Sequence, residues 1–264
     1  MNQIFISAAF LVLASVCNTN AKKIAAVGDS ITEGFCSSDE NKYAWPVQLG
    51  NMLTNGDGES EYEVTNFGVG GRTMLKKGDW PYWNEKAYQM SLEYEPDIVV
   101  IMFGTNDSKA NNWNQEDFIA DYKDMIASYQ ALGSSPDIYI MIPPPLYQTD
   151  VYGMSSHVVN EVFPILIPQI AEQAGFDTSK NVNVIDVFNY MGGKDLTQWE
   201  LFCDDQRCDA CHPNDAGYAF LGAKIYGKLF GKPLPQKGDN WAETVTDELF
   251  YWYSDELSIG RSLR

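Results

Sequence analysis

Five short runs rich in apolar residues recur along the chain, and a polar or glycine-containing turn follows each. They cover residues 24–28, 62–67, 98–103, 138–142 and 182–187. The run Ile-Val-Val-Ile-Met-Phe at 98–103 is apolar throughout, which is typical of a parallel strand buried on both faces. The pattern therefore predicts five β-strands.

Between these runs, apolar residues recur at helical spacing. The spacing predicts helices over about 43–54, 84–94, 115–132, 157–174 and 214–230. Pro164 and Pro168 lie inside the fourth of these segments and predict a break or kink there. Residues 29–42 are expected to form a loop. Strands that alternate with helices indicate an α/β fold, here a three-layer α/β/α sandwich with a mostly parallel five-stranded sheet.

The two ends of the chain depart from this alternation. Residues 4–16 are apolar and are followed by Thr19-Asn20-Ala21, which predicts a signal peptide over 1–21 and a secreted or secretory-pathway protein. The run is too short to span a bilayer, although no Lys or Arg precedes it and an uncleaved anchor is the alternative. Residues 232–264 form a C-terminal extension, so the domain is expected to span 22–231.

The composition suits a single sizeable domain, with 264 residues of which 45% are hydrophobic. The net charge of −18 and the pI of about 4.3 disfavour nucleic acid and anionic membranes as partners. No later segment is long and apolar enough to predict stable membrane insertion. The charge does not identify a substrate, and the oligomeric state stays open.

A serine follows the first predicted strand in a turn bounded by glycines. In Gly28-Asp29-Ser30 the hydroxyl is expected at the carboxyl edge of the sheet, where open α/β sheets bind ligands. A serine nucleophile requires a base, and the chain has only two histidines. His212 has Asp209 three residues before it, a spacing that lets the carboxylate orient the imidazole. His157 opens an apolar helical pattern and is expected to be structural or exposed.

Two further loops supply candidate donors for an oxyanion. One covers residues 66–73 and contains Gly70-Gly71, where glycine permits unusual dihedral angles and close backbone approach. The other, Gly104-Thr105-Asn106-Asp107, directly follows the apolar run at 98–103. A tetrahedral intermediate requires hydrogen-bond donors aimed at its charged oxygen, and both loops follow predicted strands.

These blocks, in this order, resemble the SGNH hydrolases, also called the GDSL esterase/lipase family. The family's four motif residues or pairs fall on Ser30, on Gly71 in Asn-x-Gly-x-x-Gly, on Asn106, and on Asp209 with His212. The resemblance spans roughly residues 23–230 and implies a flavodoxin-like strand order. It also implies acyl transfer through Ser30 without a metal or organic cofactor. The oxyanion donors would be the N–H groups of Ser30 and Gly71 and the Asn106 amide.

An aromatic loop over residues 74–84 follows the second block. Indole rings stack on sugars and an arginine can pair with a carboxylate, so residues in and near this loop are candidate substrate contacts. They are Arg72, Trp80, Trp83 and Trp113. The alternative is a structural loop packed on the next helix. The segment also resembles, more loosely, carbohydrate and sialate O-acetylesterases.

Four cysteines remain once Cys17 leaves with the signal peptide. An even number in a secreted chain predicts two disulfides with three possible connectivities among Cys36, Cys203, Cys208 and Cys211. A bridge from Cys36 into the 203–211 loop would connect the serine turn to the histidine loop. The rival is a zinc site built from the last three cysteines and His212. We expect no metal, because His212 is better used as a base.

The expected function is that of a secreted serine ester hydrolase, most readily a carbohydrate O-acetylesterase that acts on an acetylated sialic acid or another acetylated sugar. Its partner would be a small-molecule or glycan ester. One alternative is a lysophospholipase or other lipid esterase, which requires an apolar acyl groove. Another is a carbohydrate-binding protein that has no catalytic activity.

Overall fold

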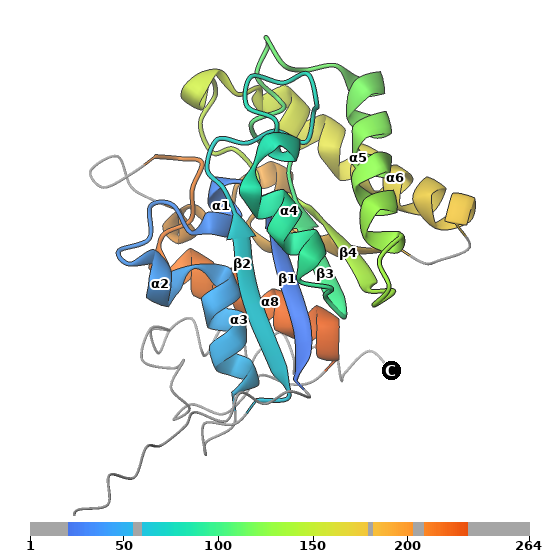
Figure 1. The fold of residues 1–264 in the computed structure, drawn as a ribbon. Helices are drawn as coiled ribbons and strands as arrows, with labels where there is room; N and C mark the ends of the chain where they lie inside the picture. Colours follow the sequence, from blue (N-terminus) through green and yellow to red (C-terminus); the bar gives the residue numbers. More distant parts are fainter. Residues whose placement is uncertain (1–20, 55–59, 179–181, 203–208, 232–264) are drawn as a thin grey trace, which may run out of the picture.

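A five-stranded sheet forms the centre of the computed structural model, which describes residues 21–54, 60–178, 182–202 and 209–231. All strand pairs are parallel, and the order is β2-β1-β3-β4-β5 (Figure 1). This is the flavodoxin-like order, so the predicted fold class is confirmed. The strands are β1 (Lys22–Gly28), β2 (Tyr62–Gly68), β3 (Ile98–Met102), β4 (Asp137–Ile142) and β5 (Val182–Asp186).

Side chains of strand β1, which lies between β2 and β3, alternate between two apolar cores. Ala25 and Val27 face one core, whereas Ile24 and Ala26 face the other, and all four are completely buried. Such double burial explains why this run reads as continuously apolar rather than alternating. Both faces of the sheet must therefore be covered by helices.

Helices lie on both faces of the sheet (Figure 1). One face packs against α3 (Trp45–Leu53) and α8 (Asp215–Phe230). The opposite face packs against α4 (Lys86–Glu93), α5 (Gln115–Gln130) and α6 (Phe163–Thr178). The three layers place the carboxyl ends of all five strands at one edge, where loops are free to carry functional groups.

The fourth predicted helix is not interrupted: a π-helical turn stands close to the prolines where a break or kink was expected. His157 precedes a π-helical turn, Val158–Val162, and α6 starts directly after it. Pro164 lies at the junction of the π-helical turn and α6, where it has no backbone N–H to donate to the preceding turn. Pro168 lies inside α6.

Short helices were not anticipated in several segments. The expected loop at 29–42 contains α1 (Ser30–Glu33) and α2 (Glu40–Tyr43), so that expectation is wrong. Asp29 and Asp39 cap these turns, since each carboxylate accepts a hydrogen bond from a backbone N–H two residues later. One-turn elements also occur elsewhere: η1 (Tyr82–Asn84), η2 (Val151–Gly153), α7 (Val187–Tyr190), η4 (Gly193–Asp195) and η5 (Trp199–Leu201).

The segment after β1 is bound by α8. Ser38 donates hydrogen bonds from its backbone N–H and its hydroxyl to Asp215 at 2.8 and 2.6 Å. The Tyr218 hydroxyl donates to the Phe35 carbonyl at 2.7 Å. These hydrogen bonds connect the segment beside the serine turn to α8, which lies near the other end of the domain in sequence.

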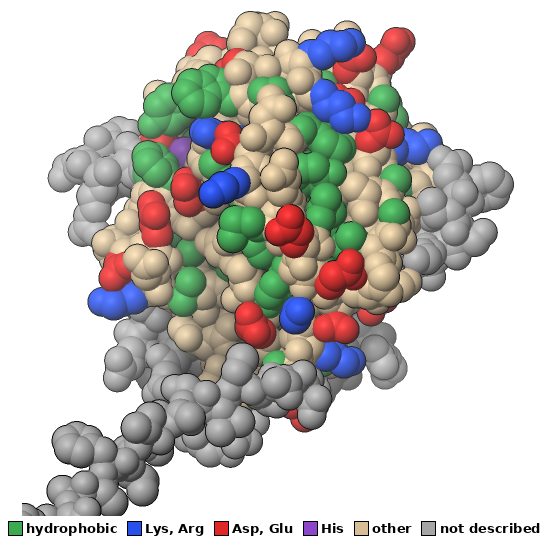
Figure 2. All heavy atoms as spheres, viewed as in Figure 1, with side chains coloured by type: hydrophobic (Ala, Val, Ile, Leu, Met, Phe, Trp, Pro, Cys, Tyr) green, Lys and Arg blue, Asp and Glu red, His purple; other side chains and the backbone are tan. Residues whose placement is uncertain are grey.

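Acidic and basic side chains are interspersed on the molecular face drawn in Figure 2. Lys76, for example, pairs with Asp121 and Asp124 of α5. Within the described part of the chain, no helix combines the length and apolarity needed to cross a bilayer. Residues 1–20 and 232–264 lie outside that part, so the signal peptide and the C-terminal extension stay predictions.

Candidate active site

The structure brings the predicted serine, histidine and aspartate together. Ser30 Oγ lies 2.8 Å from His212 Nε2, although 182 residues separate the two. His212 Nδ1 lies 2.8 and 3.0 Å from the two carboxylate oxygens of Asp209. Ser30 is 8% exposed and His212 3% exposed. A buried serine, a buried imidazole and a partly buried carboxylate joined in this order can act as nucleophile, general base and orienting carboxylate.

Local hydrogen bonds hold the acidic member of this group. Asp209 Oδ1 accepts from the backbone N–H groups of Cys211 and His212, each at 2.8 Å. Burial alone would raise the pKa of Asp209, but the hydrogen bond and charge of His212 outweigh it and lower that pKa to about 2. Asp209 is thus a carboxylate across the working pH range and fixes Nδ1 as the donor.

A four-residue helix presents the nucleophile. Asp29 accepts from Ile31 N at 3.0 Å and so caps α1, whose first residue is Ser30. A Cβ on Gly28 would lie 2.6 Å from the Met102 carbonyl, so only glycine fits between β1 and β3 here. Burial raises the pKa of Asp29 to about 6, although hydrogen bonds from Ile31 and Asn106 oppose the rise.

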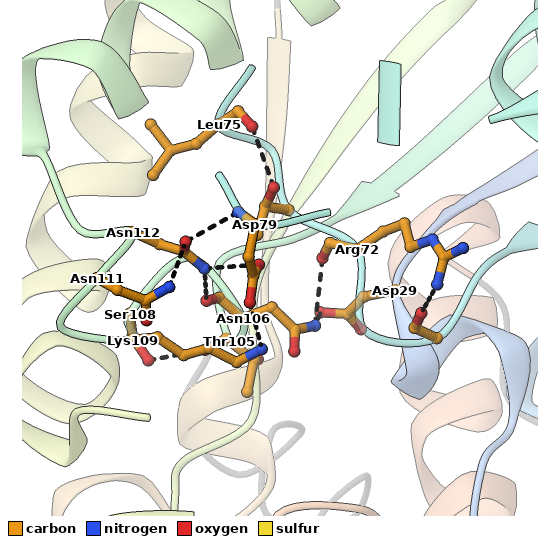
Figure 3. Close-up of polar contacts among 12 residues, drawn as sticks. Asp29, Arg72, Leu75, Asp79, Thr105, Asn106, Ser108, Lys109, Asn111 and Asn112 are labelled. Atoms are coloured by element: carbon orange, nitrogen blue, oxygen red, sulfur yellow. Dashed lines mark hydrogen bonds and ion pairs between the residues drawn. The ribbon is translucent and has the colours of Figure 1, made fainter. Parts of the chain in front are cut away.

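The two predicted donor loops meet beside Ser30. Asn106 Nδ2 lies 3.2 Å from the Arg72 carbonyl and 3.4 Å from Asp29 Oδ2, and Figure 3 shows the amide between these two residues. Gly71 has φ +77°, a left-handed conformation that favours glycine. The ends of β1, β2 and β3 therefore deliver Ser30, Gly71 and Asn106 to one place, as an oxyanion site requires.

A second buried carboxylate joins these loops, and no pattern in the sequence singles it out. Asp107 accepts hydrogen bonds from Leu75 N at 2.7 Å and Met74 N at 3.1 Å. Burial raises its pKa to about 7 in spite of these two donors. Because Asp107 adjoins Asn106 and its donors lie just after Gly71, the carboxyl group holds the two candidate donor loops together.

Of the candidate substrate contacts, Arg72 and Trp80 form a pair at the surface. The guanidinium lies under the Trp80 ring, 4.9 Å from its centroid, and Trp80 is 57% exposed. Arg72 Nε also donates to Glu85 at 2.8 Å, and Nη1 donates to the Gly70 carbonyl at 2.7 Å. Its charge is thus already paired, and the exposed group at this rim is the indole of Trp80.

The other two tryptophans pack against the core. Trp83 donates from Nε1 to the Met74 carbonyl at 2.7 Å, and Trp113 contacts the rings of Phe118 and Phe163. These contacts favour the structural alternative for both residues, and their binding of substrate stays a prediction. His157 is mostly exposed and lies 3.5 Å from Glu161, in agreement with its expected surface role.

Two exposed aromatic residues beside the imidazole were not anticipated. Phe35 meets His212 edge to face, with ring centroids 4.9 Å apart. The Tyr152 hydroxyl donates to Asp209 Oδ2 at 3.0 Å. Phe35 follows the serine block closely and could have been suspected on that ground. Tyr152 lies in a segment without any motif, so its sequence position carried no signal.

The sulfur chemistry differs from the expectation at one position. Cys211 is a buried thiol whose Sγ lies 3.8 Å from Met154 Sδ, so two disulfides that use all four cysteines are excluded. Cys203 and Cys208 lie outside the described residues, and the remaining connectivity stays a prediction. Cys36, Asp209 and His212 lie close together, but Cys36 is disulfide-bonded and so offers no thiolate to a metal. Both ring nitrogens of His212 are also engaged, by Ser30 and Asp209.

Known proteins are similar to this chain in sequence. A sequence model described as the GDSL-like lipase/acylhydrolase family matches residues 26–220. An acetylxylan esterase from Xylanibacter ruminicola is 35% identical over 216 residues, which cover 75% of this chain. The chain spans 41% of the length of that relative.

Solved structures share the fold. A lipase/acylhydrolase from Enterococcus faecalis has a TM-score of 0.56 at 25% identity, covering 81% of this chain and 100% of that one. A two-domain esterase active on acetylated mannans has a TM-score of 0.57 at 20% identity, covering 82% of this chain and 52% of that one. An acetyl xylan esterase has a TM-score of 0.57 at 20% identity, covering 79% and 100%.

Proposed function

The chain belongs to the GDSL-like lipase/acylhydrolase family, and from this membership we propose that it is a serine esterase that removes acetyl groups from neutral carbohydrates. The observation that carries the proposal is the 2.8 Å contact between Ser30 Oγ and His212 Nε2, with Asp209 behind the imidazole. This arrangement serves acyl transfer and gives the serine the base that it lacks alone.

The reaction follows from these positions. Ser30 Oγ attacks the ester carbonyl while His212 Nε2 takes its proton, and Asp209 stabilises the resulting imidazolium. The carbonyl oxygen becomes an oxyanion, which the backbone N–H groups of Ser30 and Gly71 and the Asn106 amide bind. His212 then protonates the leaving sugar alcohol. Water, activated by the same imidazole, releases acetate from the acyl-enzyme.

A carbohydrate substrate is supported by two independent observations. The relative that is 35% identical is an acetylxylan esterase, and one structural neighbour acts on acetylated mannans. Trp80 presents an exposed indole, a surface on which sugar rings stack well. Its contact with the Arg72 guanidinium holds the ring in place.

A neutral sugar fits this site better than a sialate. A sialate carries a carboxylate, which requires an available cation for recognition. Arg72 is already paired with Glu85 at 2.8 Å, and the net charge of −18 repels anions. We therefore propose an acetylated xylan or a similar neutral glycan, and we infer secretion from the signal-like residues 1–21.

Rates of p-nitrophenyl acetate and p-nitrophenyl decanoate hydrolysis test the activity, and acetate release from acetylated xylan tests the substrate. Ser30→Ala and His212→Ala are expected to lose nearly all activity. His157→Ala is the matched control, since it removes the other histidine, which is exposed and pairs with Glu161.

A preference for acetate together with acetate release from xylan supports the proposal. A preference for decanoate would move the function to a lipid esterase. Rapid deacetylation of sialic acid with no action on xylan would reverse the choice of sugar. Activity that survives Ser30→Ala would contradict the mechanism.

A further inference from the structure

The loop that follows β4 lies along the loop that carries the acid and the base. Tyr147 N donates to the Ala210 carbonyl at 3.1 Å. Further along, Met154 Sδ lies 3.8 Å from Cys211 Sγ, and both residues are buried. Between these two anchors, the Tyr152 hydroxyl reaches Asp209 Oδ2 at 3.0 Å. The segment 147–154 therefore forms the outer wall of the Asp209–His212 loop.

The backbone at this wall adopts a conformation that residues with side chains avoid. Tyr152 has φ +52° and Asp150 has φ +61°, both in the left-handed region, and Gly153 follows at φ +77°. A tyrosine rarely occupies this region, because its Cβ crowds the backbone. Such a conformation persists only where surrounding contacts hold it, and it clusters at functional sites.

Burial does not explain why Tyr152 is held there. The side chain is 61% exposed, so it contributes little to a core. Its hydroxyl, in contrast, contacts the same carboxylate oxygen that lies 2.8 Å from His212 Nδ1. The Tyr152 ring centroid lies 6.4 Å from that of His212, so the side chain extends across the acid toward the base.

We propose that Tyr152 is a positioning residue for the acid–base pair, whose hydroxyl orients Asp209 toward His212 and draws off part of the carboxylate's charge. The inference rests on the esterase function proposed above. A carboxylate with an additional donor attracts the imidazolium less, so loss of this hydroxyl should strengthen that attraction. The strained backbone serves to aim the hydroxyl from outside the loop.

Several ionisable or polar groups act on this pair and must stay constant in any test. Asp209 is faced by His212, by Tyr152 and by Cys36, whose Sγ lies 4.0 Å from Oδ2. The carboxyl groups of Asp29 and Glu33 also act on His212 through their charges. A substitution that removes only the phenolic oxygen leaves all of these groups in place.

Tyr152→Phe tests the proposal, with Tyr94→Phe as the matched control. Tyr94 is a partly exposed tyrosine whose hydroxyl lies 3.4 Å from the Glu63 carbonyl, at the opposite end of the sheet. We expect kcat on p-nitrophenyl acetate to fall about threefold to tenfold in Tyr152→Phe, as for the loss of one hydrogen bond, with KM unchanged. The acid limb of the kcat/KM profile should move to higher pH. Circular dichroism checks that each variant is folded.

Each outcome bears on a different claim. Wild-type hydrolysis that does not depend on Ser30 would remove the proposed function itself. Wild-type activity with an unaltered kcat and an unaltered pH profile in Tyr152→Phe would overturn the positioning role alone. A fall in kcat without movement of the acid limb would also overturn it, because the hydroxyl would then act only on structure. A fall in kcat with a shifted limb, absent from Tyr94→Phe, supports the proposal.

Discussion

Replacement of the buried Asp107 by asparagine should make the pH dependence of folding visible. The carboxyl group accepts hydrogen bonds from Leu75 N and Met74 N and has a pKa raised to about 7, chiefly by burial. Asparagine has nearly the same shape and does not titrate. The difference in unfolding free energy between wild type and Asp107→Asn therefore reports on this one group.

The size of the effect follows from the pKa. Between pH 3.8 and about 7, Asp107 keeps its proton in the folded state and loses it in the unfolded state. The contribution of Asp107 to the free energy of unfolding is therefore fully present below pH 3.8 and is lost as the pH rises to about 7. Each pKa unit corresponds to about 1.4 kcal/mol of unfolding free energy, so the difference between the two pKa values corresponds to ~4 kcal/mol. About two of these units lie above pH 5, so the wild type should lose ~3 kcal/mol relative to the variant between about pH 5 and pH 8.

Urea unfolding followed by tryptophan fluorescence at the two pH values measures this difference. Asp137→Asn, which removes an exposed carboxyl at the start of β4, is the matched control for the loss of one negative charge. Asp29 is present in every variant, but its charge acts on Asp107, so the difference includes the coupling between these two carboxyl groups. A wild type that gains stability relative to Asp107→Asn as the pH rises would refute the reasoning, because the two backbone donors would then favour the charged form.

Three further substitutions test the rest of the site. Asn106→Ala should lower kcat on p-nitrophenyl acetate by about 10²–10³-fold with little change in KM, and an unaltered rate would remove Asn106 from the oxyanion site. Gly71→Ala meets no atom within 4 Å but keeps φ +77°, so it should destabilise the fold by ~1 kcal/mol and lower kcat. Thermal unfolding and initial rates measure the two effects. Trp80→Ala should weaken acetate release from acetylated xylan more than p-nitrophenyl acetate hydrolysis, and an equal loss on both substrates would contradict stacking.

Much of the fold could be predicted from the sequence because its inner strands β1 and β3 are buried on both faces. The run at 98–103 is apolar in every position, and the structure places β3 there at the centre of the sheet. Short helices could not be found in this way. The four residues of α1 are too few to show helical periodicity, and the Asp29 cap that stabilises the turn is a local hydrogen bond.

The site also contains residues that the sequence reveals and residues that only the structure reveals. Ser30, Asp209 and His212 were found because nucleophile, acid and base must be particular residue types at particular spacings. Asp107 and Tyr152 act through contacts to partners 32 and 57 residues away, and no spacing in the sequence reports such contacts. The ion pair between Arg72 and Glu85 could not be predicted either, since Glu85 is one of many acidic residues in the sequence. Contacts made by the fold decide these roles.

The span between Ser30 and His212 has a consequence for synthesis of the protein. The nucleophile leaves the ribosome early, whereas its base follows 182 residues later and α8 after that. At about 5–20 residues per second, the serine exists for roughly ten seconds or more without its base. Because Asp215 and Tyr218 of α8 bind Ser38 and Phe35 beside the serine turn, the nascent chain should have no hydrolytic activity until α8 has docked. The onset of ester hydrolysis should thus report the docking of α8, and we expect a stalled chain that ends before residue 212 to leave substrate uncleaved.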